Sequence, residues 1–313
     1  MTLIALVLLF AGVVALYFDE RFHSDYLAFP LGALALNLLA AIVSNGAFRK
    51  QLWLMVFHLA LLTLVSLLAV SRLSYLRGTL ELSDGGEFTG ALVEQRAGLL
   101  HPLEKLQALR FANLGFHIDY VPGPLPHGIR NLIEVRDGSG IPRQMEITDQ
   151  QPLLLAGYRF YPTTNKGFAP TFDWRPTGGQ SITGTVNLPS YPVHEHGQAR
   201  EWTPPGASFK LWTQLQFDEV IVPADRPSQF HLPQKHIIVL RLGEQRWELT
   251  PGQSVDLPGG RITYQGLRGW MGYEVFYDWT IPWLLAACLL AVGAMGMHFW
   301  SKFSARPWNG EAA

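Results

Sequence analysis

Charge is scarce in this chain, and the little that is present is balanced. Of 313 residues, 16% are Asp, Glu, Lys or Arg, and the formal net charge is −1. A typical soluble domain carries about 25% charged residues. A nucleic-acid-binding protein needs a basic surface that neutralises phosphates. The composition therefore excludes nucleic acid as an expected partner.

Cysteine is almost absent. The single residue, Cys288, permits neither an intrachain disulfide nor a Cys-x-x-Cys site. This excludes a thiol–disulfide oxidoreductase. The chain also lacks the GxGxxG, P-loop, GxSxG and HExxH motifs. Since no paired carboxylates and no Ser/His/Asp set stand out either, we expect no enzyme activity from the chain alone.

The chain does have long stretches without any charged residue. A helix needs about 20 residues to cross the hydrocarbon core of a membrane, with a range of about 17–25. The uncharged stretches therefore predict four transmembrane helices, at about 2–18, 27–45, 52–71 and 279–301. The first stretch lacks the basic n-region and the small-x-small cleavage site of a signal peptide, so we expect it to be retained.

Basic residues in the short loops predict the orientation. Arg49 and Lys50 lie between the second and third predicted helices, and further basic residues lie in 302–313. Because cytoplasmic loops are enriched in Lys and Arg, these segments are expected inside, with 302–313 as a cytoplasmic tail. Residues 72–278 are then expected on the extracytoplasmic side.

Residues 72–278 have the patterns of β structure. The run IEVRDGSGIPRQMEI alternates apolar and polar residues around Asp137-Gly138-Ser139-Gly140, which is typical of a hairpin turn. One short helix is predicted near 101–112. The predicted fold class is a membrane protein with four transmembrane helices and a large, mainly antiparallel β extracytoplasmic domain between helices 3 and 4. Without cysteine, this domain must gain its stability by burying aromatic side chains.

His58 is the most informative single residue. It lies about a third of the way into the third predicted helix. An ionisable side chain inside a transmembrane segment is costly, and so it is a functional hypothesis by default. A neutral imidazole is also an axial ligand of haem iron. The alternative is a histidine that hydrogen-bonds to a neighbouring helix.

Other polar residues have simpler interpretations. For Asn37, in the second helix, we expect a hydrogen bond between helices. We expect His298, near the inner end of the fourth helix, to reach toward the lipid headgroups. Cys288 is expected to be a small packing residue. Small residues beside it would let another helix approach closely, either from a partner or from this chain. They are Ala287, Ala291 and Ala294.

Two further patterns lie outside these helices or at their ends. His194-Glu195-His196 would place both imidazoles on one face if the segment were extended, but no third metal ligand is apparent, so we expect an exposed loop. Trp53, Trp279 and Trp283 are expected in the interfacial belts of the membrane.

Taken together, these residues resemble the ResB (CcsB) family of System II cytochrome c biogenesis. The order of three spans, a large external domain and a fourth span is that of the family. The motifs similar to the family's are ALNLLAAIV in the second helix, FHLALLTLVSLLAVSRLSYLRGTLELSDGGEF in the third helix and its exit, IEVRDGSGIPRQMEITDQQPLLLAGYRFYPT in the domain, and YEVFYDWTIPWLLAACLLAVG at the last helix. Asp278-Trp279-Thr280 departs from the family's Asp-Pro-Gly, and the chain is short for the family, so it resembles a compact, divergent member.

The resemblance implies a role in haem handling in a bacterial cytoplasmic (inner) membrane. His58 matches the family's early histidine of the third helix, an axial ligand of haem b that is transported and shared with a CcsA-like membrane partner. The second axial ligand would come from that partner. The resemblance thus implies an accessory subunit of a holocytochrome c synthase, with apocytochrome c and the lipid bilayer as its other partners.

Two other functions stay open at this stage. The first is a haem-free scaffold or assembly factor for another envelope complex. The second is a membrane-tethered sensor, which would need an output domain that residues 302–313 do not supply.

Overall fold

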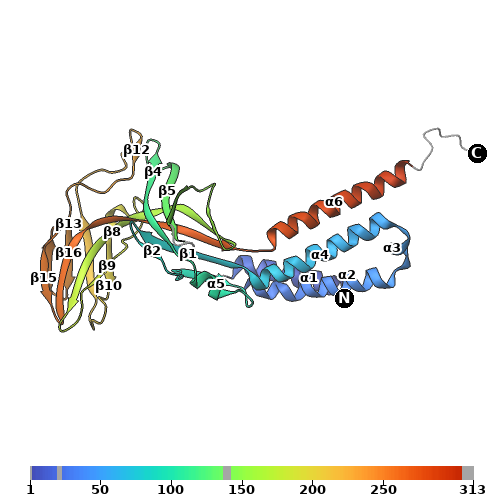
Figure 1. Cartoon of the computed structure of the whole chain (residues 1–313), viewed down its shortest axis with the longest axis horizontal. Helices are drawn as coiled ribbons and strands as arrows, with labels where there is room; N and C mark the ends of the chain where they lie inside the picture. Colours follow the sequence, from blue (N-terminus) through green and yellow to red (C-terminus); the bar gives the residue numbers. More distant parts are fainter. Residues whose placement is uncertain (1, 20–22, 137–141, 305–313) are drawn as a thin grey trace, which may run out of the picture. The chain divides into compact units, whose positions relative to one another are not determined.

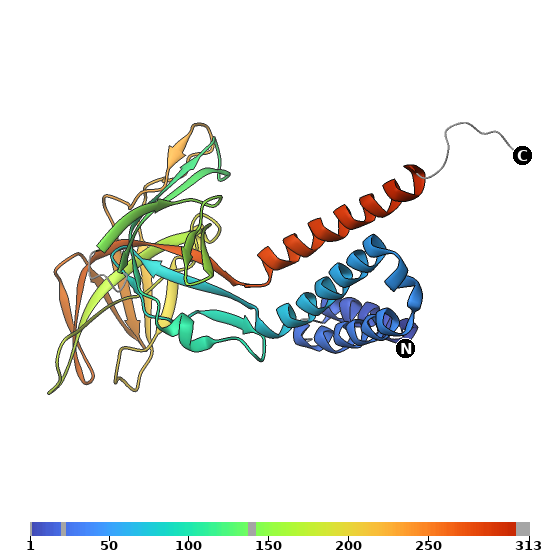
Figure 2. The same ribbon diagram turned by 45° about the vertical axis from the view of Figure 1, so that its right-hand side comes forward.

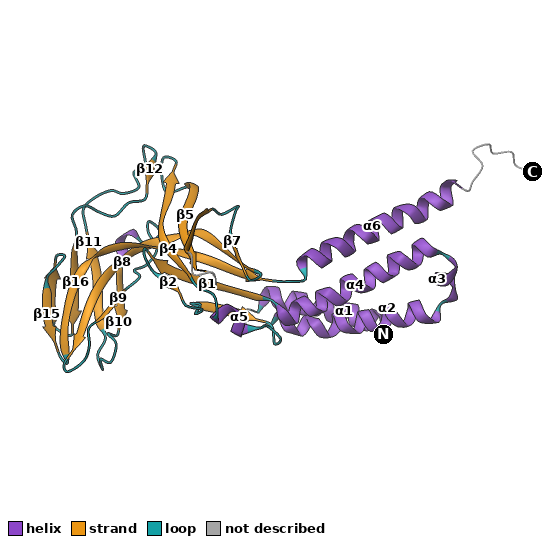
Figure 3. Ribbon diagram, in the orientation of Figure 1, coloured by secondary structure: helices purple, strands orange, loops and turns teal. Residues whose placement is uncertain are grey.

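The structure is a computed structural model that describes residues 2–19, 23–136 and 142–304. The chain divides into two compact units. The long helices belong to one of them and nearly all strands to the other, as the colours of Figure 3 make plain. We call them the helical unit (Met1–Arg77, Arg96–Pro102 and Phe276–Ala313) and the β unit (Gly78–Gln95 and Leu103–Val275).

The helical unit is built from helices that follow the uncharged stretches. They are α1 (Thr2–Phe18), the 3-10 turn η1 (Ser24–Leu27), α2 (Ala28–Ser44), α3 (Gly46–Lys50), α4 (Leu52–Ser74) and α6 (Ile281–Ser304). Helix α1 packs on α2, α2 packs on α4, and α4 packs on α6. Helices α2 and α4 lie side by side in both ribbon views (Figures 1 and 2).

Three helices are long and apolar enough to cross a membrane: Ser24–Ser44, Leu52–Ser74 and Ile281–Ser304. The predictions at 27–45, 52–71 and 279–301 are confirmed to that extent, with the third helix running three residues further. The first predicted segment, 2–18, forms the apolar 17-residue helix α1. That α1 crosses the membrane stays a prediction. The chain therefore has the make-up of a membrane protein with a β domain.

Asp278 fixes the residue that directly precedes α6. The Asp278 Oδ1 atom accepts hydrogen bonds from the backbone N–H of Thr280 (2.9 Å) and from its hydroxyl (2.7 Å). The second carboxylate oxygen accepts a 2.7 Å hydrogen bond from the Ser71 hydroxyl of α4. Thr280 directly precedes α6 and accepts a hydrogen bond from the backbone N–H of Leu284. A carboxylate just before a helix also suits its positive end. This pair also ties the start of α6 to the end of α4.

The β unit contains three sheets. Their strand orders are β3-β1-β16-β8-β7, with β15 on β16 and β9 on β8; β12-β4-β5-β6, with β2 on β4; and β10-β11-β13-β14. The strands of the first sheet are β1 (Leu76–Ser83), β3 (Glu94–Ala97), β7 (Leu153–Leu155), β8 (Tyr158–Pro176), β9 (Ile182–Thr185), β15 (Ser254–Leu257) and β16 (Gly260–Tyr277). Those of the second are β2 (Glu87–Phe88), β4 (Phe111–Tyr120), β5 (Pro126–Arg136), β6 (Pro142–Ile147) and β12 (Ser228–Gln229). Those of the third are β10 (Ala199–Trp202), β11 (Leu211–Gln216), β13 (Ile237–Leu242) and β14 (Gln245–Leu249).

The sequence patterns for this unit hold in their main points. Strands β5 and β6 pair antiparallel with Arg136 opposite Pro142, as the hairpin pattern predicted. The turn residues Asp137–Gly140 lie outside the described residues. The helix predicted near 101–112 is the short α5 (Leu103–Gln107).

Aromatic side chains form the core of the β unit, as expected for a domain without cysteine. Phe88, Phe111 and Phe160 meet with ring centroids 5.0–5.5 Å apart, and Tyr273 lies 6.1 Å from Phe111. Edge-to-face pairs at such distances are favourable beyond the area they bury. All four side chains are almost fully buried.

A buried polar chain crosses this core. The Tyr273 hydroxyl donates to the side-chain oxygen of Asn131 (2.9 Å), and the Asn131 amide donates to that of Asn113 (2.7 Å). Asn113 in turn donates to a carboxylate oxygen of Asp84 (3.4 Å). Burial raises the pKa of Asp84 to about 6, against the lowering effect of the hydrogen bond from the Gly269 backbone. Because every member finds a partner, the chain can be buried without an orphaned polar group.

Candidate functional site

His58 lies in the second turn of α4, at its N-terminal end. Its side chain is half-buried. The Nδ1 atom lies 2.7 Å from the carbonyl oxygen of Leu54, one helical turn earlier. A carbonyl oxygen only accepts hydrogen bonds, so Nδ1 carries the proton in this contact.

The Leu54 contact determines what the other ring nitrogen can do. In a neutral imidazole only one nitrogen is protonated, so the Nε2 atom of His58 keeps its lone pair. No residue that the structure describes hydrogen-bonds to this Nε2 atom. Histidines that bind metals almost always donate their other N–H to a carbonyl or a carboxylate, which fixes the tautomer and the ring orientation. The described contacts of His58 are compatible with a bond from Nε2 to a metal.

Two aromatic rings flank the imidazole. The ring centroid of Phe48, from α3, lies 4.3 Å from that of His58, and the Phe57 centroid lies at 5.2 Å in an edge-to-face arrangement. The surroundings are thus apolar and aromatic. A flat apolar macrocycle such as haem is compatible with such neighbours, so the described residues fit a haem ligand at this position.

A groove of about 420 Å³ lies elsewhere in the helical unit, between α4 and α6. Its lining is almost entirely apolar: Val56, Leu59, Ala60, Thr63, Leu67, Trp279, Trp283, Ala286, Ala287 and Leu290. His58 is two residues from both Val56 and Ala60, which at about 100° per residue places it on the opposite side of α4. The lining offers no imidazole, thiol or carboxylate to a metal. The groove and the candidate ligand are therefore separate features.

The other polar residues predicted in the helices have clear places. Asn37 donates a 2.6 Å hydrogen bond to the Thr2 hydroxyl of α1, which confirms the expected contact between helices. The prediction for His298 is wrong, because its side chain is 7% exposed and buried on the face of α6 that carries the alanines. The prediction for Cys288 is also wrong, since this side chain is exposed.

The alanine stripe on α6 packs within the chain. Ala287, Ala291 and Ala294 are buried, and α6 packs on α4. Of the two alternatives, the intramolecular one is therefore correct for this face. Cys288 immediately follows Ala287, so it points away from the packed face.

The pattern His194-Glu195-His196 forms no metal site. The segment is not extended, because His194 precedes the 3-10 turn η2 (Glu195–Gly197). Both histidines are exposed, which agrees with the predicted exposed loop. Among the described residues no cluster of three or more His, Cys, Asp or Glu side chains could hold a metal ion.

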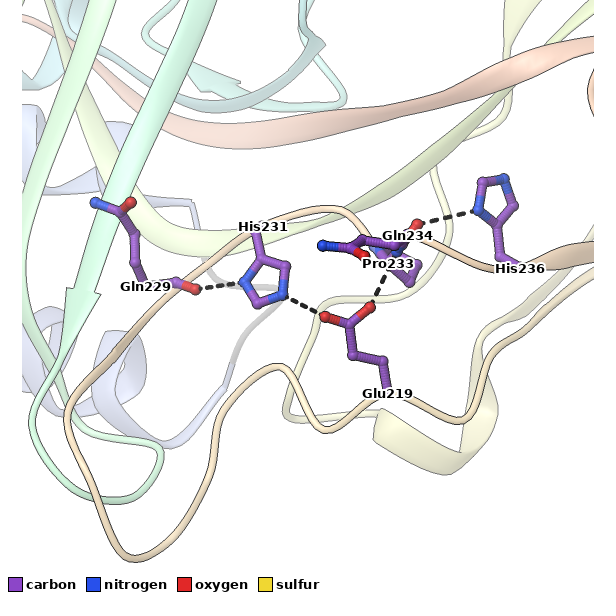
Figure 4. Close-up of polar contacts among 6 residues, drawn as sticks. All are labelled: Glu219, Gln229, His231, Pro233, Gln234 and His236. Atoms are coloured by element: carbon purple, nitrogen blue, oxygen red, sulfur yellow. Dashed lines mark hydrogen bonds and ion pairs between the residues drawn. The ribbon is translucent and has the colours of Figure 1, made fainter.

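The sequence patterns missed a polar cluster in the β unit, shown in Figure 4. His231 Nε2 lies 2.8 Å from a carboxylate oxygen of Glu219, and Nδ1 lies 2.9 Å from the backbone oxygen of Gln229. The other Glu219 oxygen accepts a 3.0 Å hydrogen bond from the backbone N–H of Gln234. The Gln229 carbonyl and then Glu219 raise the pKa of His231, because both ring nitrogens face acceptors.

This cluster ties together the ends of an irregular segment. Glu219 and His231 are twelve residues apart, and His236 beyond them bonds the Tyr264 hydroxyl (2.8 Å) and the Pro233 carbonyl oxygen (3.1 Å). A separation of this kind follows no helical or strand period, so no local pattern could have indicated the pair. We interpret the cluster as a structural clamp on an exposed loop.

Comparisons with known proteins give little. No protein-family model and no curated protein matches the chain. Among solved structures, a protein described as cytochrome c heme lyase CcmF is similar over 94% of this chain, at 12% sequence identity and a TM-score of 0.28. The chain spans only 33% of the length of that structure. At such values the likeness carries no argument about function.

Proposed function

We propose that this chain is a haem-handling membrane subunit of System II cytochrome c biogenesis. In this proposal it works with a CcsA-like membrane partner in the bacterial cytoplasmic membrane and supports the covalent attachment of haem to apocytochrome c. The proposal starts from the resemblance of its motifs to the ResB (CcsB) family. All four helices would cross the bilayer, with residues 72–278 on the extracytoplasmic side.

The observation that supports the proposal best is the state of His58. Its Nδ1–H is held by the Leu54 carbonyl at 2.7 Å, in the span that the resemblance also points to. Here the fixed tautomer leaves Nε2 as a lone-pair donor, which is what an iron ligand requires.

In this role haem is cargo, and the residues of the chain hold it. His58 would supply one axial nitrogen, and the partner would supply the second. Phe48 and Phe57 would shield the ligand from competing water, because both rings lie against the imidazole. The β unit contains no cysteine and so cannot compete for haem with the thiols of an apocytochrome.

The test is a visible absorption spectrum of the purified complex. The full chain is co-expressed with its CcsA-like partner and purified in detergent, as wild type, as His58→Ala and as His298→Ala. We expect a bis-imidazole haem spectrum in the wild type, lost or strongly weakened in His58→Ala. His298→Ala is the matched control, because it removes another imidazole, a buried one, from the long helices of the helical unit. It should keep the spectrum.

Two results would contradict the proposal. One is a wild-type complex without haem, and the other is haem that is indifferent to His58→Ala while the complex stays intact. The alternative would then be the haem-free scaffold. That function is favoured by one observation, the apolar groove between α4 and α6, which offers docking surface but no iron ligand.

A further inference from the structure

A short loop of the chain is fixed to the end of α4. Residues 96–102 belong to the helical unit, although they lie far along the chain from the helix. The backbone N–H of Gly98 donates to the Tyr75 carbonyl (2.9 Å), and that of Leu100 donates to the Leu73 carbonyl (2.7 Å). His101 Nδ1 lies 3.0 Å from the carbonyl oxygen of Ser74. The loop is thus bonded to three successive residues at the C-terminal end of α4.

The approach is close enough to require glycine. A Cβ atom added to Gly98 would overlap the backbone carbonyl of Leu73. These hydrogen bonds also satisfy carbonyl groups that the last turn of a helix leaves without a partner inside the helix. The loop is therefore a rigid extension of the helix end, and its position follows that of the helix.

Two large apolar side chains project from this rigid loop. Leu99 is 80% exposed and Leu100 is 69% exposed. Neighbouring leucines that are both exposed, on a backbone held to the end of α4 by three hydrogen bonds, are not explained by folding of the chain itself. They need a covering surface.

Their neighbours indicate which surface this is. Trp279 donates its indole N–H to the Ser74 hydroxyl (3.1 Å), so it lies at the same level of α4 as the loop, and it is 45% exposed. Exposed tryptophans at the ends of spanning helices belong to the membrane–water interface. The leucines are therefore at the level where one leaflet of the bilayer ends.

Basic residues complete this pattern. Arg72 lies in the last turn of α4. Arg77 follows the helix by three residues, Arg96 begins the loop 96–102, and both side chains are exposed. The guanidinium carbon of Arg77 lies 5.1 Å from the ring centroid of Phe276, a cation–π contact. Arginines at the membrane surface are attracted to anionic lipid phosphates. Charge and apolar exposure thus fit one partner, a phospholipid leaflet.

We propose that residues 98–101 form a membrane wedge, with Leu99 and Leu100 inserted into the interfacial part of the extracytoplasmic leaflet. The inference rests on the membrane crossing of α4 and α6 that is part of the proposed function, but not on haem. Its consequence is a second contact between chain and bilayer, placed where the chain passes between the two units. The wedge would fix the depth of the helix end in the leaflet.

Depth-dependent quenching tests this proposal in the full chain. Cys288→Ala removes the only cysteine, and single cysteines are then introduced by Leu99→Cys, Leu289→Cys or Val193→Cys. Each is labelled with the fluorophore NBD, and the protein is reconstituted in vesicles of phosphatidylethanolamine and phosphatidylglycerol. Leu289 in α6 (65% exposed) reports membrane crossing, and Val193 in the β unit (76% exposed) is the matched exposed control.

We expect the label at residue 99 to emit at shorter wavelength than that at residue 193. It should be quenched by lipids with a nitroxide near the headgroup and protected from aqueous iodide by severalfold. Water-like emission and full iodide quenching at residue 99, with residue 289 in hydrocarbon, would overturn the wedge and leave the spanning helices intact. Water-like emission at both positions would overturn the wedge and the membrane placement together.

Discussion

The two units bury opposite kinds of side chain. In the helical unit the buried apolar residues are mostly alanines: Ala5, Ala28, Ala60, Ala287, Ala291 and Ala294. Large side chains such as Phe10, Val292 and Trp300 are more than 70% exposed there. In the β unit the fully buried side chains are large, with Phe111, Phe160 and Tyr264 at 0%.

This inversion reflects the solvent that each unit is built for. In water, burying a large apolar side chain contributes about 1.5–3 kcal/mol, so large residues go inside. In lipid, the tails are as apolar as leucine, and helices associate through close packing of small residues. The contrast therefore identifies the solvent of each unit from burial alone. Each prediction below changes one side of this contrast.

The largest effect is expected from the aromatic core of the β unit. Phe160 is fully buried and meets Phe88 and Phe111 at 5.5 and 5.0 Å. Phe160→Ala leaves a cavity and should lower the free energy of unfolding by about 3–5 kcal/mol. The measurement is urea unfolding of the full chain in detergent, followed by tryptophan fluorescence.

The matched control lies on the lipid-facing side. Leu289 in α6 is 65% exposed, and Leu289→Ala removes a similar apolar side chain without leaving a cavity. Its unfolding midpoint should stay at the wild-type value. A loss as large as that of Phe160→Ala would mean that the exposed face of α6 is buried against something, and the contrast between the units would fail.

A smaller effect is expected where α6 packs on α4. Ala291 is buried on the packed face, and Val292, the next residue, is 73% exposed. Ala291→Leu inserts three carbons into a close contact and should destabilise the helical unit by about 1–3 kcal/mol. SDS titration followed by far-ultraviolet circular dichroism measures this. Val292→Leu is the control and should be silent, whereas equal effects at both positions would show that neither face is the packed one.

The sequence predicted the helices well because the signal was strong. Absence of charge over about 20 residues requires no tertiary information, and three of the four segments match helices long enough to cross. The sequence did not predict correctly which side chains of α6 are buried and which are exposed. His298 is buried and Cys288 is exposed on a helix that is apolar all round, and such a helix gives no periodic signal to separate lipid from protein.

The candidate site was predicted in part. His58 stood out because an imidazole inside a span is rare, and its bond to Leu54 needs only the geometry of one helical turn. The sequence offered no hint of Glu219 with His231, nor of the loop around Leu99. Both depend on residues that meet only after the chain has folded.

The smallest effect is expected at Lys166, a basic residue buried within the aromatic core of the β unit. Its side chain is buried, with the ammonium nitrogen 4.9 Å from the ring centroid of Tyr120 and 5.9 Å from that of Phe230. Its only described hydrogen bond is to the Thr164 carbonyl oxygen (3.3 Å). Burial among these rings lowers the pKa of Lys166 to about 8.

The sign of the pH effect follows from this lowered pKa. Between about pH 8 and the ordinary lysine value, the unfolded chain binds more protons than the folded one, so the free energy of unfolding must rise with pH. Relative to Lys166→Met, the wild type should gain about 1.5 kcal/mol between pH 8 and about pH 9.5. Burial raises the pKa values of the nearby Tyr120 and Tyr191, and both tyrosines are present in the wild type and in Lys166→Met. Urea unfolding of both proteins across the window gives the difference, with Lys235→Met, which removes an exposed lysine, as the control. Parallel pH curves for the wild type and Lys166→Met would mean that the ammonium group reaches water. The aromatic core of the β unit would then be open to solvent at this position.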